Sequence, residues 1–350
     1  MLDDNLKNKE LIKGYYIRER KKSFFKRIFF NLWILIFLFI IGSIVLILLY
    51  KTGFTFSQIR VNLDKLGPDG GILPEYEQVI KKDPDRINIL LLGIRGVNDP
   101  NGGLLADAIM VISIKESTKK VALISIPRDL YIEIPGKNFK EKINAAYAFG
   151  EEQYFNGGGL LASKVAVSGV TGQYIDYAVS IDFKAFQEIV DSLGGIDIYL
   201  DESFSEPLQW AGMGEFYLPA GKNHLNGETS LYYIRSRYST SDFDRMRRQQ
   251  QVLASLKDKA FSLGFLANPL KIYKLLDILG NNVKTDMGID DINKLINLSL
   301  SIDKTDIKHR FLDTTSEGLL YSSNIDGIYI LLPKNGDYEK IHEVCKNIFN

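Results

Sequence analysis

The sequence of 350 residues is 45% hydrophobic and 25% charged, enough for one large domain or two ordinary ones with a packed core. Its 43 basic residues balance 43 acidic ones, which argues against a protein that binds nucleic acid through a broad positive field. A single cysteine, Cys345, excludes an internal disulfide framework, and three widely separated histidines argue against a zinc centre.

An uncharged run at residues 28–50 predicts a membrane anchor. Its 23 residues are mostly Ile, Leu and Phe, and as a helix they would span about 35 Å, enough to cross a bilayer. Most charges before it are basic, so the positive-inside rule places residues 1–27 in the cytoplasm and everything after Tyr50 outside. A cleaved signal peptide is the alternative, but no small-x-small cleavage pattern follows the run. We therefore expect a single-pass protein of the cell membrane.

Apolar periodicity after a linker at 51–84 predicts alternating strands and helices. The linker is rich in glycine and proline, and the continuous apolar run at 87–93 is typical of a buried central strand. In chain order we then expect a hairpin at 108–114 and 121–126, a short helix ending at Gly150, a helix at 160–168, a strand at 177–181, a helix at 183–193, a strand at 196–200, a loop-rich stretch at 201–225, helices at 227–235, 242–263 and 290–298, and strands at 307–312 and 328–332.

This order predicts an α/β protein: an α-β-α sandwich with a central mixed sheet, preceded by one transmembrane helix. We expect a core domain at 85–263 and a C-terminal α/β extension at 264–350 that packs on it. Gly157, Gly158 and Gly159 lack the spacing of a nucleotide-binding P-loop and predict a turn before the next helix.

Polar residues follow the predicted strands at places where ligands collect in α/β sheets. The stretch "SIPRDLYIEIPG" puts Arg128 and Asp129 just past a strand end. Asp107 lies at the mouth of the second strand, and its carboxylate suits a hard cation such as Mg²⁺. Lys142 and Asn144 lie near a predicted helix start. Each of these residues, taken alone, is better explained as part of an ordinary turn or surface.

The stretch "YIRSRYSTSDFDRMRRQQQ" is a stronger signal, because it crowds five arginines around a predicted helix start at Asp242. We expect Asp242 to cap this helix and to orient an arginine. Arg245, Arg248 and Gln249 share one face of the helix, and planar guanidinium groups near a helix N-terminus bind phosphate in a bidentate manner. The residues alone leave two interpretations open: a diphosphate site, or an exposed lattice of Asp–Arg ion pairs.

Together these stretches resemble the LytR–CpsA–Psr family of cell-wall glycopolymer ligases. The matching runs are "NILLLG", "SIPRDLYIEIPG", "KINAAYAFG", "IDYAVSIDFKAFQEIVDSLGGIDI", "LPAGKNHLNGE" and "YIRSRYSTSDFDRMRRQQQ", in order over residues 87–262, followed by "NNVKTDMGIDDI" and "YILLPK". The resemblance implies an enzyme that transfers a glycopolymer, with its proximal phosphate, from a polyprenyl-diphosphate carrier to a peptidoglycan hydroxyl outside the membrane. The implied partners are this lipid-linked glycan, peptidoglycan and the membrane, with no nucleic acid.

The family pattern also implies roles for particular residues. It implies that the diphosphate is bound by Arg128, Arg235, Arg237, Arg245, Arg248, Gln249, Lys142 and Asn144, that Arg128, Asp129, Asp242 and Arg245 form the catalytic group, and that Asp107 ligates Mg²⁺. Phosphoryl transfer depends mainly on positioning and charge neutralisation, so a catalytic histidine is not required. The prenyl tail is expected in an apolar channel between sheet and helices.

Two departures from the family pattern bear on the metal. The family has Gly-x-Asp where this chain has Gly93-Ile94-Arg95, and Arg-x-Asp where it has Leu105-Ala106-Asp107. We expect Arg95 to neutralise the diphosphate in place of a tightly held cation, and Mg²⁺ dependence to be weakened or altered. Two alternatives stay open: a pyrophosphatase acting on the same lipid, and a non-catalytic envelope protein that binds prenyl phosphates.

Overall fold

The computed structural model describes residues 59–63, 79–97, 99, 103–207, 214–237, 239–260, 282–288, 290–291, 294–295, 298 and 307–350. In these ranges no helix has the length and apolar character needed to cross a membrane. The predicted anchor at 28–50, most of the predicted linker and the end of the predicted helix at 242–263 lie outside the described residues.

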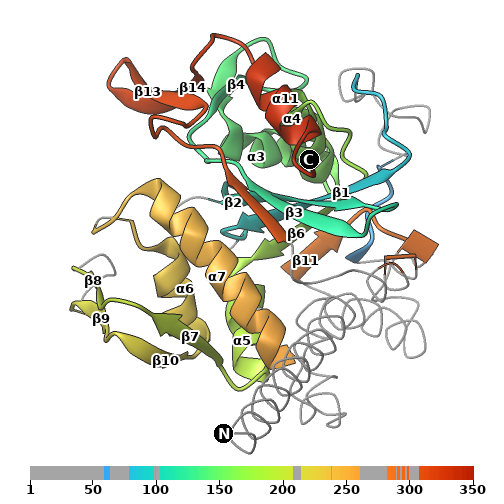
Figure 1. The fold of residues 1–350 in the computed structure, drawn as a ribbon. Coiled ribbons are helices and arrows are strands. Elements are labelled where there is room, and N and C mark those ends of the chain that lie inside the picture. The colour runs from blue at the N-terminus through green and yellow to red at the C-terminus, as the bar shows by residue number, and fades with distance from the viewer. Residues whose placement is uncertain are drawn as a thin grey trace, which may run out of the picture.

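A six-stranded mixed sheet forms the centre of the molecule (Figure 1). Its order is β11-β6-β1-β2-β3-β12; β1 pairs antiparallel with β2 and parallel with β6, and β3 pairs antiparallel with β2 and parallel with β12. The strands are β1 (Arg86–Ile94), β2 (Ala106–Lys115), β3 (Lys120–Ser125), β6 (Tyr177–Asp182), β11 (Val283–Thr285) and β12 (Ile307–Phe311). The predicted central strand, the hairpin after it and the strands at 177–181 and 307–312 are confirmed.

Helices cover both faces of this sheet, so the predicted α-β-α arrangement is confirmed for the described part of the chain (Figure 1). One face carries α3 (Ala146–Gln153), preceded by the 3₁₀ turn η3 (Ile143–Ala145), together with α4 (Gly158–Thr171) and α11 (Glu339–Lys346). The other face carries α5 (Phe183–Ser192), α6 (Gly227–Arg235) and α7 (Asp242–Ala260). The last three helices were predicted from their periodicity, whereas α11 was not.

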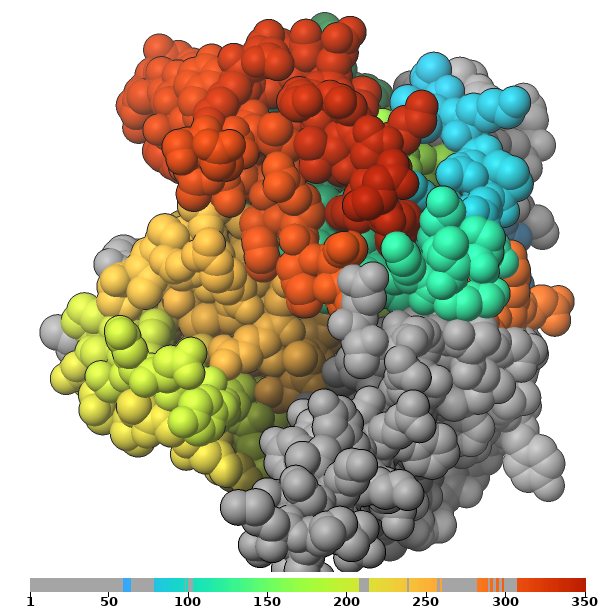
Figure 2. Space-filling view, in the orientation of Figure 1, coloured from blue at the N-terminus to red at the C-terminus, as the bar shows by residue number. Residues whose placement is uncertain are grey.

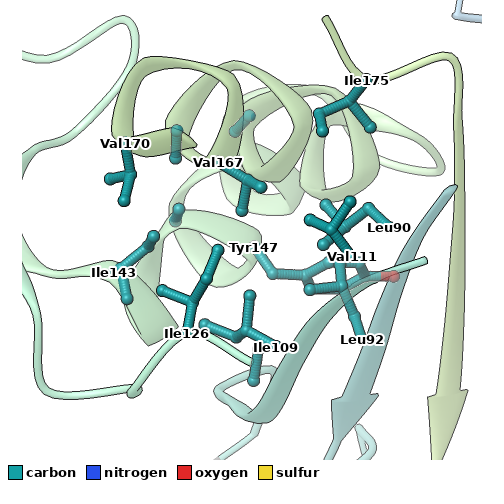
Figure 3. Packing of buried hydrophobic residues seen from close by; sticks show 14 of the residues in the cluster. Leu90, Leu92, Ile109, Val111, Ile126, Ile143, Tyr147, Val167, Val170 and Ile175 are labelled. Atoms are coloured by element: carbon teal, nitrogen blue, oxygen red, sulfur yellow. The ribbon is translucent and has the colours of Figure 1, made fainter. Parts of the chain in front are cut away.

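The main apolar core lies between β1, β2 and the helices α3 and α4. Leu90 and Val111 point from the strands toward Tyr147 and Val167 of the helices (Figure 3). Burial of such side chains stabilises a fold by roughly 1.5–3 kcal/mol each. Tyr147 is fully buried, and its hydroxyl lies 3.2 Å from the hydroxyl of Ser180, so its polar atom is satisfied within the core.

The predicted helix end at Gly150 is wrong: α3 continues past it to Gln153. Gly150 is instead the crossing point with the next helix, because a Cβ there would lie 2.2 Å from the carbonyl oxygen of Gly158. Gly158 and Gly159 are the first residues of α4 rather than a turn before it, and a Cβ on Gly159 would meet the ring of Tyr147. The glycines thus permit close helix packing, a use that helix-end rules do not anticipate.

The predicted loop-rich stretch at 201–225 is also wrong. Three short strands lie in it: β8 (Phe204–Glu206) pairs antiparallel with β9 (Phe216–Leu218), and β10 (Gly221–Leu225) pairs antiparallel with β7 (Ile196–Leu200), the predicted strand that precedes the stretch. Their apolar residues pack with those of α5, α6 and α7 in a separate cluster. The short strands carry too few residues for a clear alternating pattern, which explains why periodicity missed them.

The last part of the chain contributes both edges of the sheet and a separate hairpin. β12 extends the sheet beyond β3, and β11 extends it beyond β6. The hairpin consists of β13 (Leu320–Ile325), which was not predicted, and β14 (Ile328–Pro333), which was. In Figure 2 the surface of these C-terminal residues, in red, meets that of residues 227–260, in gold. This contact brings the hairpin to the neighbourhood of α7.

Candidate functional site

The site lies where β1 and β3 end and β2 begins. The antiparallel register places these three strand termini side by side at one end of the sheet. Ile94 at the end of β1 pairs with Ala106 at the start of β2, and Met110 of β2 pairs with Ser125 at the end of β3. Arg95, Asp107 and Arg128 each follow or begin one of these strand ends and are therefore brought together, although they are up to 33 positions apart.

Two guanidinium groups hold the carboxylate of Asp107. Nε of Arg95 donates to Oδ2 at 2.9 Å, and Nη1 of Arg128 donates to Oδ1. Asp107 and Arg128 are both buried. Burial alone would raise the pKa of Asp107, but the charges of Arg128 and Arg95 outweigh it and hold the pKa below its usual value. The carboxylate therefore stays ionised and fixes the direction of both guanidinium groups.

A tight turn presents the next carboxylate. Leu130 N–H donates to the carbonyl of Pro127, so Arg128 and Asp129 lie in a turn directly after β3. The following strand β4 (Tyr131–Glu133) pairs with β5 (Lys140–Lys142), which places Lys142 beside the turn. Its Nζ donates to Oδ1 of Asp129 at 2.6 Å, while Oδ2 lies 3.6 Å from Nε of Arg128.

The start of α7 supplies another acid–base pair. Ser241 caps the helix, since its hydroxyl accepts from the N–H of Asp244 and donates to the carboxylate of Asp244. The prediction that Asp242 is the cap is therefore wrong. Asp242 lies in the first turn, where Oδ1 pairs with Nη2 of Arg245 at 2.8 Å. Two acids in this turn offset the unfavourable position of arginine near the positive end of the helix.

A buried polar link fixes α7 against the sheet. Nε2 of Gln250 donates to the hydroxyl of Ser125 at the end of β3, at 2.8 Å, and Oε1 of Gln250 lies 2.6 Å from Nδ1 of His309 on β12. Ser125 is three residues before Arg128, and Gln250 is five residues after Arg245. The link therefore sets the distance between the two parts of the site, and sequence reasoning missed it because nothing local distinguishes Gln250 from its neighbours.

Three buried polar atoms at this junction have no hydrogen-bond partner in the described part of the protein. They are Nε of Arg128, Nε of Arg245 and Oδ2 of Asp242. The side chain of Arg245 is only 3% exposed, so water does not replace a partner easily. The two guanidinium nitrogens are donors whose desolvation cost an anionic ligand would offset, whereas Oδ2 of Asp242 is an acceptor. The two donors point to phosphate or another oxyanion as the natural ligand.

The remaining predicted residues differ in how closely they join this group. Arg235, at the end of α6, lies with its guanidinium 4.4 Å from the ring centre of Phe183, and its pKa is lowered by burial and affected by the charges of Asp107 and Arg95. Arg235 therefore belongs to the rim of the site. Asn144 is buried next to the turn, its N–H donating to the carbonyl of Arg128. For two others no contact with this group is described: Arg237 is exposed, and the amide nitrogen of Gln249 lies 3.5 Å from the carbonyl oxygen of Ile234.

Arg248 is buried but is turned toward protein backbone. Its three nitrogens donate to the carbonyl of Tyr233 at 2.9 Å, to the hydroxyl of Thr240 at 3.0 Å and to the carbonyl of Ser236. It thus ties the end of α6 and the segment before α7 to α7 itself. The predicted role in binding diphosphate stays a prediction, and the contacts favour a positioning role.

Sequence reasoning also missed Tyr329. Leu331 N–H donates to the carbonyl of Asp129 at 2.9 Å, and Leu331 forms a parallel bridge with Leu130, so β14 runs alongside the turn that carries the site. The pKa of Tyr329 is raised by burial and then by the charges of Asp129 and Asp242. No sequence signal marks Tyr329, because its place beside the site depends on the pairing of its hairpin with a turn about 200 positions earlier in the chain.

The donor set does not fit a divalent cation. Mg²⁺ requires several oxygen ligands in near-octahedral geometry, yet both oxygens of Asp107 are bonded to guanidinium groups. A cation on Oδ2 would have to displace Arg95. The oxygens of Asp129 face Lys142 and Arg128. Across the described ranges, no three His, Cys, Asp or Glu side chains are grouped so as to hold a metal.

The site is electropositive, which suits an anionic ligand. Its charged members are the cations Arg95, Arg128, Lys142, Arg235 and Arg245 and the carboxylates of Asp107, Asp129 and Asp242. The cations outnumber the acids even when Asp99, which acts on Arg235, is counted. In a partly buried setting an excess of positive charge attracts phosphate more strongly than it would on open surface.

Comparison with known proteins shows the family to which the chain belongs. The sequence profile of the LytR_cpsA_psr family matches residues 68–347, so the chain belongs to that family. The polyisoprenyl-teichoic acid–peptidoglycan teichoic acid transferase TagU of Bacillus licheniformis is 29% identical over 280 residues, 79% of this chain and 83% of TagU. TagU of Oceanobacillus iheyensis is 34% identical over 218 residues, 61% of this chain and 63% of that relative. The crystal structure of B. subtilis TagV, 26% identical, superposes with a TM-score of 0.57 over 76% of this chain and 97% of TagV.

The contacts of Arg248 lead to a stability prediction. Arg248→Ala leaves two buried carbonyls without their donor, and we expect it to reduce the free energy of unfolding by about 2–4 kcal/mol. Arg247→Ala is the matched control, because Arg247 is exposed and makes an ion pair with Asp244 and a contact 5.7 Å from the ring centre of Phe311, both weak at the surface; we expect a change of at most about 1 kcal/mol. Thermal unfolding of the full-length protein in detergent measures both. Equal melting temperatures for the two variants would contradict the positioning role.

Proposed function

We propose that this protein transfers a glycopolymer, together with its proximal phosphate, from a polyprenyl-diphosphate carrier to a hydroxyl group of peptidoglycan. One observation carries the proposal. The buried guanidinium groups of Arg128 and Arg245 and the half-buried one of Arg95, from three distant segments, lie around the carboxylates of Asp107 and Asp242, and Nε of Arg128 and Nε of Arg245 have no hydrogen-bond partner in the described structure. Relatives of the chain are named teichoic acid transferases that act between a polyisoprenyl carrier and peptidoglycan.

The geometry suits the charge changes of such a transfer. The acceptor oxygen forms a bond to the phosphorus that bears the glycopolymer, the bond from that phosphorus to the bridging oxygen breaks, and polyprenyl phosphate leaves. Fixed guanidinium groups stabilise the charge that develops on the phosphoryl oxygens and on the leaving phosphate. Their orientation is set beforehand by Asp107 and Asp242, so little reorganisation is needed during the reaction.

Asp242 is the best placed group to receive the proton of the acceptor hydroxyl. Its Oδ2 has no hydrogen-bond partner within the described structure, while Oδ1 is held by Arg245. Burial raises the pKa of Asp242, and the nearby charges of Arg245 and Arg128 only partly oppose this. A carboxylate with a raised pKa is a more effective base near neutral pH than an exposed one.

The prenyl chain would lie against apolar side chains that border the site at the margin of the main core. This core reaches the site, because Ile94 at the end of β1 belongs to it and Phe243, next to Asp242, packs against it. We further propose that residues 28–50 anchor the chain with a cytoplasmic N-terminus. That arrangement would keep the site on the outer side of the membrane, where the carrier lipid and the peptidoglycan acceptor meet.

We also propose that the transfer does not require Mg²⁺. The guanidinium of Arg95 donates to the oxygen of Asp107 that a cation would need, and it brings its own positive charge to the site. A guanidinium group is permanently protonated and binds phosphate oxygens directly, so it can neutralise a diphosphate without a metal. This proposal agrees with the lack of a suitable donor set around Asp107.

The first test changes the shape of one cation without removing its charge. Arg245→Lys keeps a partner for Asp242 but loses the planar fork that reaches two phosphate oxygens; we expect transfer to fall about 10- to 100-fold. Arg247→Lys, on the exposed side of the same helix, is the control and should retain wild-type activity.

Product analysis of the full-length protein with lipid-linked glycopolymer decides between the candidate activities. Phosphate-linked polymer on peptidoglycan supports transfer. Polymer phosphate released equally with and without peptidoglycan indicates a pyrophosphatase, and an unchanged lipid with full binding indicates a non-catalytic protein. Either of the last two results contradicts the proposed function.

A second test addresses the metal. We expect the wild-type protein to retain its transfer rate in excess EDTA, because Arg95 supplies the positive charge. Arg95→Asp removes that charge and frees Oδ2 of Asp107, so we expect its transfer rate to fall in EDTA and to recover in part with Mg²⁺. Wild-type activity that is lost in EDTA and restored only by Mg²⁺ would refute metal independence.

A further inference from the structure

The site has two halves of different chemistry. At the strand ends, Arg95 and Arg128 surround Asp107 and form a cationic half. On the side of α7 and the C-terminal hairpin, Asp129 and Asp242 come close to Tyr329, whose pKa responds to both carboxylates. The diphosphate contacts the first half and Arg245, whereas the carboxylates of Asp129 and Asp242 make the rest of the second half less suited to a further anion. The second half is therefore left to another ligand.

Strand register places Tyr329 at this second half independently of its titration. Leu331 pairs in parallel with Leu130 and donates its N–H to the carbonyl of Asp129 at 2.9 Å. Two residues earlier, Tyr329 lies on the same side of β14 as Leu331, because side chains alternate along a strand. Across the hairpin, Tyr329 pairs with Asn324. The hairpin thus brings a phenol and an amide to the edge of the site.

Tyr329 is available to a ligand in a way that the arginines are not. It is 48% exposed, and Asn324 beside it is exposed as well. Asp242, which acts on Tyr329 electrostatically, has Oδ2 buried without a partner in the described structure. The ring of Tyr329 supplies an apolar face, and hydrogen-bonding groups come from Oδ2 of Asp242 and from the amide nitrogen of Asn324, whose oxygen accepts from the N–H of Gly327 at 2.7 Å.

We propose that Tyr329, with Asn324, forms the subsite for the acceptor sugar of a glycan strand. A pyranose ring has an apolar C–H face, which can stack on the phenol ring of Tyr329. It also has hydroxyl groups, which can donate hydrogen bonds to carboxylates. A sugar therefore matches this half of the site. The sugar hydroxyl that attacks phosphorus would then approach Oδ2 of Asp242. The inference rests on the proposed function and gives the C-terminal hairpin its role.

Steady-state kinetics of the full-length protein test the subsite. With lipid-linked donor saturating and a soluble glycan-strand fragment varied, we expect Tyr329→Ala to raise the KM for the glycan fragment about tenfold, as for loss of a central aromatic contact. The KM for the donor should stay within about twofold of wild type, since the cationic half is untouched. Tyr329→Phe keeps the ring and should retain most of the affinity for the glycan. An equal rise in both KM values, or no rise for the glycan fragment, overturns the proposal.

A binding measurement separates this inference from the proposed function. We would measure binding of the glycan-strand fragment, and separately of farnesyl diphosphate, to the full-length protein in nanodiscs without catalysis. Tyr329→Ala should weaken only glycan binding, and Tyr321→Ala, on the opposite face of the same hairpin, should weaken neither. Glycan binding that depends on Tyr329 in a protein without transferase activity would support the subsite and refute the proposed function. Glycan binding that is unaffected by Tyr329→Ala would refute the subsite.

Discussion

The double ion pair of Asp107 with Arg95 and Arg128 is the interaction on which the site depends. A buried carboxylate is costly unless it is paired, and each buried guanidinium group is costly for the same reason. Here one carboxylate pairs with two cations that follow different strands. The result is a set of positive charges held in place by the fold, so that a phosphate ligand meets donors that are already oriented.

The rest of the architecture serves this arrangement. The antiparallel β1–β2–β3 order brings three strand termini to one end of the sheet. The hydrogen bonds of Gln250 with Ser125 and His309 fix α7 beside these termini. The hairpin β13–β14 adds Tyr329. The arginines at the start of α7 would be unfavourable near the helix dipole by themselves. Asp242 and Asp244 in the same turn and the capping serine at 241 offset that penalty.

Sequence patterns predicted the long elements and the residues close to strand ends, because hydrophobic periodicity and turn chemistry are local properties. They placed Arg128 and Asp129 after β3 and Arg245 on the first turns of α7, and these positions are found in the structure. They failed at Gly150 and at 201–225, where helix crossing and short paired strands are tertiary effects. Arg248 and Tyr329 illustrate the same limit. Arg248 donates to the backbone at the end of α6, and Tyr329 is placed by the pairing of β14 with the turn at Asp129, and neither contact is visible in the local sequence.

The most direct test of the central claim is whether the site holds a prenyl diphosphate. Mass spectrometry of the full-length protein, extracted gently from membranes, would identify the lipids that stay bound. We predict a polyprenyl-diphosphate-linked glycan on the wild-type protein and its loss from the variant Arg128→Gln, with ordinary phospholipids equal in both. A wild-type protein that retains only phospholipids, or a variant that retains the same prenyl diphosphate, would contradict the account.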